Sequence, residues 1–168
     1  MEMSTDLILN HRQITSKITR LAWQIYENNM DEPTLWLAGI DQRGMDIADL
    51  IKVELSNITQ QQIRVMNIVI DRKNFEPNFF SDHAMSELKD AVVIVIDDVL
   101  NSGKTIFSAM LPLMQQQVAK IQVAVLASRS HRLFPVKADF VGISMATTLQ
   151  EHLNFDNSNP EDLKLTLS

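Results

Sequence analysis

Apolar residues near the N-terminus recur every three or four positions, which is the period of an amphipathic helix. They run from Ile14 to Ile25, and Asn10 before them is of a residue type that caps helix N-termini. The stretch Asp31 to Pro33 is polar and contains a proline, so it ends this helix. A second run with the same period predicts another helix at roughly 44–56.

Short, mostly apolar runs alternate with these helical segments. They lie at residues 34–40, 63–70, 91–96, 121–127 and 139–142. Such runs are too short for typical helices, and the absence of polar alternation is typical of strands buried on both faces. A further helix is expected from about Gly103, with Pro112 inside it. The pattern therefore predicts one α/β domain over residues 1–168, with a parallel sheet covered on both faces.

Residues 71–89 have a different character, because charged and polar side chains surround three phenylalanines. We interpret this segment as a long loop or excursion, which in compact domains is usually functional or mobile. The acidic stretch 154–162 predicts a surface loop near the C-terminus.

Composition excludes several classes of protein. The chain of 168 residues has a formal charge of −6 and no cysteine. The charge argues against a strongly basic nucleic-acid binder, and the lack of cysteine excludes disulfides, thiolate zinc sites and cysteine nucleophiles. The N-terminus lacks the features of a signal peptide, and no stretch approaches the roughly 20 apolar residues of a membrane helix. We therefore expect a cytoplasmic protein with no membrane partner.

Polar clusters follow three of the predicted strands, at residues 41–44, 97–105 and 128–132. In open parallel sheets ligands bind outside the carboxyl ends of the strands, so these clusters are the candidate site.

The second cluster is the most informative. Ser102, Gly103 and Thr105 lie where a helix N-terminus supplies unpaired N–H groups, which suits a phosphate; an ordinary capped turn has the same composition. A triphosphate-binding loop would need glycine at position 98, where the chain has aspartate. Asp97 and Asp98 instead suit ribose hydroxyls or a hydrated divalent cation, although a solvated acid pair is the alternative. One phosphate near two hydroxyls describes a ribose 5-phosphate.

These residues carry a family resemblance. Residues 93–105, VIVIDDVLNSGKT, resemble the phosphoribosyl-pyrophosphate signature of type I phosphoribosyltransferases. Segments 8–25, 37–44 and 124–142 resemble the bifunctional pyrimidine-operon attenuator / uracil phosphoribosyltransferase family (PyrR), so the similarity covers most of residues 8–148. The resemblance implies the type I phosphoribosyltransferase fold: a doubly wound, mostly parallel, five-stranded sheet with helices on both faces. It also implies a small hood, built from residues 71–89 or from the chain ends.

The resemblance further implies an activity and its site. The activity is Mg²⁺-dependent transfer of ribose 5-phosphate from phosphoribosyl pyrophosphate to a nucleobase, by a homodimer or larger homo-oligomer. The implied donor site has four parts. Asp97 and Asp98 bind the ribose hydroxyls and Mg²⁺, and the 5-phosphate is held by Asn101, Ser102, Gly103, Lys104 and Thr105. A pyrophosphate loop, which often contains a cis non-proline peptide, consists of Asp41, Gln42, Arg43 and Gly44, and a flexible loop contains Arg72. Arg43 would neutralise the charge of the leaving group, and closure of the loop that contains Arg72 would shield the developing positive charge on the ribose from water. For Arg43 a surface ion pair is the alternative role.

The implied base pocket consists of Ser128, Arg129, Phe140 and Val141, with the backbone of Val141 against the base. Purine-specific relatives have an acid at the position of Asn101 and a lysine at that of Ser128, and neither is present here. Uracil is therefore the first expectation, with hypoxanthine or guanine as the alternative. The attenuator family itself usually has Tyr and Asp at these two positions, which leaves the identity of the base open.

Two other functions compete with the transferase. The family's RNA surface includes basic residues matched by His131, Arg132 and Lys137, so a UMP-sensing RNA-binding regulator is one rival. Its next basic position is Ile143 here, and the overall charge is negative, which disfavours RNA; a solvated loop or a dimer contact are other roles for these side chains. A response-regulator domain would need an acid pair after the first strand, where the chain has a lone Asp41.

Overall fold

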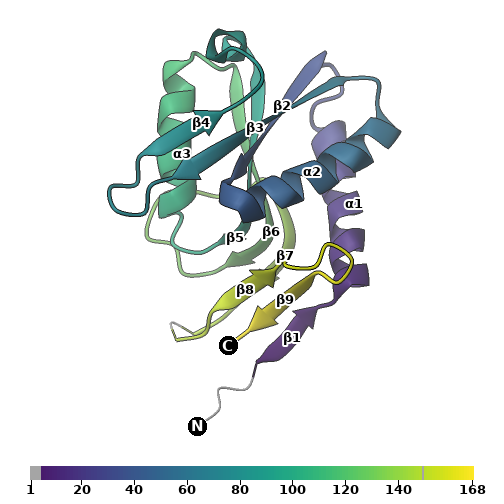
Figure 1. Ribbon diagram of the computed structural model, residues 1–168, viewed down its shortest axis with the longest axis vertical. Coiled ribbons are helices and arrows are strands. Elements are labelled where there is room, and N and C mark those ends of the chain that lie inside the picture. Colours follow the sequence, from purple (N-terminus) through teal and green to yellow (C-terminus); the bar gives the residue numbers. More distant parts are fainter. Residues whose placement is uncertain (1–4, 149) are drawn as a thin grey trace.

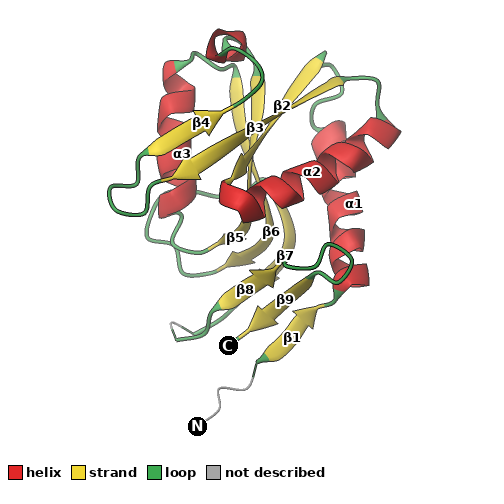
Figure 2. Cartoon of the chain, viewed as in Figure 1, coloured by secondary structure: helices red, strands yellow, loops and turns green. Residues whose placement is uncertain are grey.

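The computed structural model describes residues 5–148 and 150–168 and contains two sheets (Figures 1 and 2). The helices are α1 (His11–Glu27), α2 (Asp41–Ile58), the short 3-10 helix η1 (Met85–Leu88) and α3 (Lys104–Gln115). The strands are β1 (Asp6–Leu9), β2 (Thr34–Ile40), β3 (Gln62–Ile70), β4 (Pro77–Phe80), β5 (Val92–Leu100), β6 (Lys120–Arg129), β7 (Phe140–Met145), β8 (Leu153–Asp156) and β9 (Lys164–Leu167).

The larger sheet has the strand order β4-β3-β2-β5-β6-β7. The five strands from β3 to β7 in this order are parallel, as expected, and β4 adds an antiparallel strand beside β3. The sheet therefore has six strands rather than five. The sixth comes from the excursion at 71–89, which the sequence reading treated as a loop because a four-residue strand with partly exposed side chains has too weak a pattern.

Helices cover both faces of this sheet. Alternate residues along β2 explain why: Leu35 and Leu37 pack into a core with α1 and α2, whereas Trp36 and Ala38 pack into a second core with α3. Since side chains alternate across a strand, a strand that is apolar at every position needs cover on both sides. Figure 1 shows α3 on the side of the sheet opposite to α1 and α2.

Helix α1 begins as the sequence predicts. The Asn10 side chain accepts a hydrogen bond from the Gln13 N–H at 3.0 Å, and the Gln13 side chain accepts one from the Asn10 N–H at 2.9 Å. This reciprocal capping box satisfies two N–H groups that a helix N-terminus otherwise leaves unpaired. The predicted apolar positions from Ile14 to Ile25 are buried against the sheet.

The two chain ends form the small second sheet, with the order β1-β9-β8 and antiparallel pairing. β8 packs against β5, so this sheet sits at one end of the larger one (Figure 1). It is the hood expected from the chain ends, and it includes part of the stretch 154–162, which the sequence reading had treated as a loop. Within the residues described, no helix is long and apolar enough to span a membrane.

Candidate active site at the carboxyl ends of the parallel strands

The strand order brings the three polar clusters to one edge of the sheet. β5 lies between β2 and β6, and the clusters follow or end these three strands. In the register of the sheet, Leu100 at the end of β5 pairs with Ser128 near the end of β6, which pairs with Ser144 in β7. Sequence segments 41–44, 97–105 and 128–132 therefore meet, as the sequence predicts.

Asp97 and Asp98 lie within β5 itself rather than in the turn that follows it. Asp97 is buried, and its Oδ1 accepts a hydrogen bond from the Asp98 N–H at 2.9 Å. Asp98 faces a more open space, and its Oδ1 accepts from the Val99 N–H at 2.8 Å. Burial, and secondarily the charge of Asp98, raise the pKa of Asp97 well above its usual range.

The turn after β5 contains a small pocket of about 50 Å³, lined by Asp97 and by every residue from 99 to 106 except Lys104. Gly103 has a φ of +86°, a left-handed conformation that side-chain-bearing residues rarely adopt, and it precedes the first residue of α3. The Ser102 carbonyl accepts hydrogen bonds from the N–H groups of Leu133 and Phe134, at 2.9 and 3.0 Å. These bonds from the segment after β6 fix the turn, and the N-terminus of α3 remains available to an anion.

The segment Asp41–Gly44 is the first turn of α2, not a loop before a helix at 44–56. Gly44 explains both why α2 begins at Asp41 and why the sequence predicted a loop there. A Cβ on Gly44 would lie 2.5 Å from the Ile96 carbonyl oxygen, so the glycine allows α2 to approach β5 closely and does not mark a loop. The described residues contain no cis peptide bond, contrary to the expectation for this segment, although Asp41 has a φ of +49°.

Two arginines reach this edge of the sheet. Arg43 Nη1 lies 3.5 Å from Asp98 Oδ2, and 48% of the Arg43 side chain is exposed, so this pair adds little stability. Arg72, just after β3, donates to Thr105 Oγ1 at 3.1 Å and also pairs with Asp41. Asp41 Oδ1 accepts in turn from the Ile70 N–H at 2.9 Å. The acid pair is therefore bordered by cations from α2 and from the β3–β4 loop.

The β3–β4 loop has a second contact with the turn. Lys104 Nζ lies 3.8 Å from the centroid of the Phe75 ring, a cation–π arrangement. Phe75 has a φ of +58°. Together with Arg72, this contact holds the loop against the N-terminus of α3.

The predicted base pocket is divided by the structure. Ser128 and Arg129 line a pocket of about 160 Å³ at the ends of β6 and β7, together with Ser130, Arg132 and residues 144–146. Phe140 and Val141 do not line it, because they begin β7 instead of ending it. Phe140 is buried in the core beneath α1.

Val141 and Gly142 offer their carbonyl groups to α1 rather than to the pocket. Both carbonyls accept hydrogen bonds from Arg20 Nη2, at 2.8 and 2.5 Å. The sequence reading ended β7 at Gly142, whereas the strand continues to Met145, which moves its carboxyl end and the polar residues after it towards the site.

Residues 144–148 are therefore the part of the site that the sequence reading missed. Thr147 is buried, its Oγ1 accepts from Arg129 Nε at 2.6 Å, and its carbonyl lies 2.6 Å from His131 Nε2. A polar cluster after a strand was the signal used for the other three segments, and it is present here as well. The incorrect end of β7 concealed it.

The three predicted RNA-contacting residues are not equivalent. His131 contacts the Thr147 carbonyl, and Arg132 Nη2 donates to Ser128 Oγ at 3.3 Å. Of these two exposed residues, Arg132 lines the pocket at the ends of β6 and β7. Lys137 is exposed on the loop that leads to β7.

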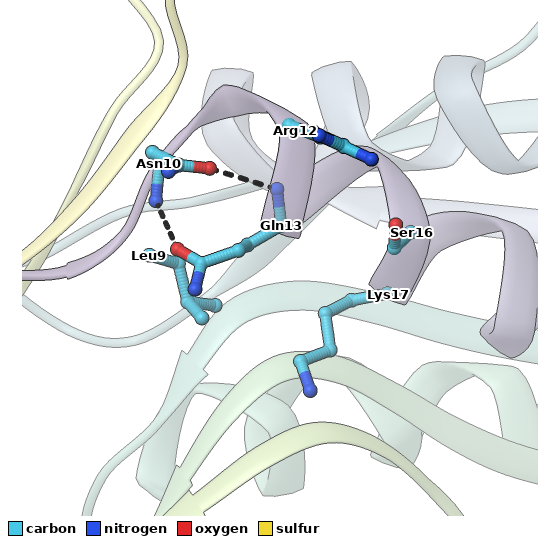
Figure 3. Close-up of a pocket in the computed structure, with 6 residues that line it drawn as sticks. All are labelled: Leu9, Asn10, Arg12, Gln13, Ser16 and Lys17. Carbon is cyan, nitrogen blue, oxygen red and sulfur yellow. Dashed lines mark hydrogen bonds between the residues drawn. The ribbon is translucent and has the colours of Figure 1, made fainter.

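A separate pocket of about 420 Å³ opens at the start of α1 (Figure 3). Figure 3 shows Asn10 and Gln13 in its wall, bonded to each other in the capping box. Because these two polar groups already satisfy each other, they offer little to a ligand.

The donor set fits a magnesium ion only in part. Within residues 5–148 and 150–168, no cluster of three or more His, Cys, Asp or Glu side chains could hold a metal. Asp97 and Asp98 provide two adjacent carboxylates. Mg²⁺ commonly binds one or two carboxylates and completes its shell with water and substrate oxygens, so the pair suits a cation that arrives with a phosphorylated ligand.

The fold and the edge just described define a class of protein. The model of the phosphoribosyl transferase domain family matches residues 4–154, so the chain belongs to that family. Among its relatives, the bifunctional protein PyrR of Fusobacterium nucleatum is 33% identical over 91% of each chain. The bifunctional protein PyrR of Pediococcus pentosaceus is 36% identical, over 88% of this chain and 89% of the relative.

Solved structures support the fold. The hypoxanthine phosphoribosyltransferase of Trypanosoma cruzi superposes with a TM-score of 0.78 over 95% of each chain, at 13% identity. A hypoxanthine phosphoribosyltransferase from Staphylococcus aureus gives a TM-score of 0.69 at 18% identity, over 86% of this chain and 80% of that one. The expected type I phosphoribosyltransferase fold is thereby confirmed.

We predict that Asp97→Asn stabilises the protein at pH 8 in buffer with EDTA. Burial makes the pKa of the Asp97 carboxyl higher in the folded than in the unfolded protein. The folded protein therefore loses stability as the pH rises from the unfolded-state pKa to the folded-state pKa, because the charged form of the carboxyl is buried. Neutral Asn avoids this cost, so its free energy of unfolding in urea should exceed that of the wild type by at least about 1 kcal/mol at pH 8. The difference should shrink towards pH 4.

Exposed Asp82, changed to Asn, is the control and should alter the free energy of unfolding little at either pH. Equal stability of Asp97→Asn and wild type at pH 8, or a difference that grows towards pH 4, would contradict the assigned cost of the buried carboxylate.

Proposed function

We propose that this protein transfers ribose 5-phosphate from phosphoribosyl pyrophosphate to uracil, releasing UMP and pyrophosphate. The observation that carries the proposal is the acid pair of buried Asp97 and partly exposed Asp98 beside the small pocket of the β5–α3 turn. In this proposal residues 101–105 hold the 5-phosphate through the turn and the α3 N-terminus. The two carboxylates accept hydrogen bonds from the ribose hydroxyls.

The charges of this edge suit the reaction. The base nitrogen attacks the anomeric carbon as the bond to pyrophosphate breaks, so positive charge grows on the ribose and negative charge on the leaving group. Asp97 and Asp98 would stabilise the first charge, and Arg43 and Arg72 the second. Little covalent chemistry is required of the protein, and rate comes from positioning and from these preorganised charges.

The β3–β4 loop lies where it could close over the proposed donor site. Arg72 and Phe75 already contact the α3 N-terminus through Thr105 and Lys104. With donor bound, Arg72 would exchange Asp41 for the pyrophosphate, and the closed loop would exclude water from the ribosyl centre. Water would otherwise compete with the base as nucleophile.

Magnesium would be held at Asp97 and Asp98, largely through water and donor oxygens. It would neutralise pyrophosphate charge when bound. The partly exposed position of Asp98 leaves room for such an ion. A cation there would also reduce the free-energy cost of keeping the charged form of Asp97 buried.

Uracil is supported by the pocket at the ends of β6 and β7. Its wall carries serine hydroxyls and Arg132, which supply donors for keto oxygens. The chain has no acid at position 101 and no lysine at position 128, the two features of purine-specific relatives. Hypoxanthine or guanine remains the second substrate class to test.

The direct test is transfer of radiolabelled uracil, hypoxanthine and guanine with phosphoribosyl pyrophosphate, with and without Mg²⁺. We expect Mg²⁺-dependent formation of UMP. Arg43→Ala should lower kcat/KM for the donor about 10- to 100-fold, the effect of one charge-assisted hydrogen bond, with little change in thermal stability.

Lys52→Ala is the matched control, since Lys52 is an exposed cation on the same helix, away from the strand ends. It should retain wild-type kinetics. No transfer to any of the three bases would refute the proposed activity, and transfer to a purine alone would refute its proposed specificity.

A second candidate is RNA-binding regulation, supported by the relatives named bifunctional protein PyrR. In the basic loop that would serve it, Lys137 makes no contact with the site, whereas Arg132 lines the pocket at the ends of β6 and β7 and His131 contacts the Thr147 carbonyl. With a chain charge of −6, few phosphates could be neutralised.

We therefore expect filter binding to pyrimidine-operon leader RNA, at 0.15 M salt, to be no tighter than about 10⁻⁶ M, the non-specific range, and to be unaffected by UMP. Tight binding that UMP strengthens, and that Lys137→Ala weakens, would show that the regulatory role is present.

A further inference from the structure

The first turn of α2, which carries Arg43, lacks the usual hydrogen bonds of a helix N-terminus. Its N-cap residue is Ile40, which has no polar side-chain atom and makes no capping hydrogen bond. The next residue, Asp41, has a φ of +49°, a left-handed conformation that is costly outside glycine and persists only where neighbouring groups hold it. The Asp41 side chain ties the start of this turn to β3 through the Ile70 N–H. The rest of the turn needs support from elsewhere.

Asp46, in the next turn of α2, supplies this support. Its Oδ1 accepts a hydrogen bond from Gln42 Nε2 at 2.6 Å, within the helix. Its Oδ2 accepts one from Asn157 Nδ2 at 2.5 Å, and Asn157 directly follows the hood strand β8. One carboxylate therefore joins the segment of the expected pyrophosphate loop to the sheet that the chain ends form.

The Asp46–Asn157 hydrogen bond is the main polar tie between α2 and the hood. Among the residues that the structure describes, no other hydrogen bond or ion pair joins α2 to residues 150–168. Beside it, helix and hood border a pocket of about 260 Å³, where Leu50 and Val53 of α2 remain exposed. Apolar packing thus does not close this part of the boundary, and the position of the hood relative to the first turn of α2 depends on Asp46 and Asn157.

We propose that Asp46 and Asn157 are positioning residues, through which the hood holds the first turn of α2, and with it Arg43, where the pyrophosphate of the donor binds. Arg43 is itself loosely held, since 48% of its side chain is exposed and its partner Asp98 is 3.5 Å away. Its place is therefore set by the backbone of the turn. The inference rests on the proposed function and deepens it, because it makes a contact of the chain ends a determinant of donor binding.

Positioning and charge predict opposite effects of removing Asp46. A carboxylate near a pyrophosphate repels it, so on charge alone Asp46→Ala should strengthen donor binding. If the carboxylate positions the turn, its loss should weaken donor binding in spite of the relieved repulsion. We expect Asp46→Ala and Asn157→Ala each to raise KM for phosphoribosyl pyrophosphate about 3- to 10-fold, the range for one hydrogen bond.

The same two variants should separate KM for the donor from the other kinetic constants. Bound donor restores the turn, so only the fraction of free protein that is competent to bind it falls. KM for uracil and kcat at saturating donor should therefore stay close to their wild-type values. A merely structural role would lower thermal stability and change the constants for donor and base together.

Two further variants test whether the effect runs through this bond and through Arg43. Asp46→Asn can keep both hydrogen bonds if a partner amide turns over, so it should recover most of the donor affinity that Asp46→Ala loses. In an Arg43→Ala background, Asn157→Ala should have a smaller effect than in the wild type, because the side chain that it positions is absent.

Asp49→Ala is the matched control. Asp49 lines the same pocket and removes the same charge, but within the described residues it makes no hydrogen bond to the hood. It should not raise KM for the donor. A rise equal to that of Asp46→Ala would overturn the inference.

Calorimetric binding of pyrophosphate with Mg²⁺ separates this inference from the transferase proposal. Weaker binding by Asp46→Ala and Asn157→Ala supports the inference even if no transfer to uracil is detected. Binding as tight as that of the wild type in either folded variant overturns it and leaves the transferase intact. A wild type that neither transfers ribose 5-phosphate nor binds pyrophosphate overturns both. If thermal unfolding shows that Asp46→Ala does not fold, Asn157→Ala decides the question.

Discussion

A carboxylate buried at the end of the central strand is the constraint around which this molecule is arranged. Asp97 lies in β5, next to Asp98, and burial raises its pKa well above the usual range. A fold selected for stability alone would place an apolar residue there, as at all five positions from Val92 to Ile96. The buried carboxylate therefore lowers the stability of the fold, and neighbouring elements place cationic side chains near it.

Close packing keeps those groups in place. Gly44 brings the first turn of α2 within contact of β5, which carries Arg43 to within 3.5 Å of Asp98. Gly103 adopts the left-handed turn that starts α3 directly beyond the acid pair. Buried Arg129 then joins that turn to the residues after β7. Chemistry that relies on positioned charges requires this kind of rigid support from several strands.

The parallel core and most of the site were predictable from the sequence, since buried parallel strands read as continuous apolar runs and polar clusters follow them. Helix α1 and its Asn10 cap follow from local pattern in the same way. The errors in the site share a cause, since they concern where elements begin or end. The start of α2 at Asp41 depends on a close approach at Gly44, which is a tertiary contact. The extension of β7 to Met145 depends on pairing with β6, and it places Thr147 at the strand ends, whereas Phe140, which the resemblance implied for the base pocket, lies in the core.

A crystal structure of the protein with Mg²⁺ and phosphoribosyl pyrophosphate tests the central claim most directly. The account predicts the 5-phosphate at the N–H groups of residues 102–105, the ribose hydroxyls within hydrogen-bonding distance of Asp97 and Asp98, and Arg72 moved from Asp41 to the pyrophosphate. Donor bound elsewhere, or no donor at a concentration that saturates the protein's activity, would contradict it.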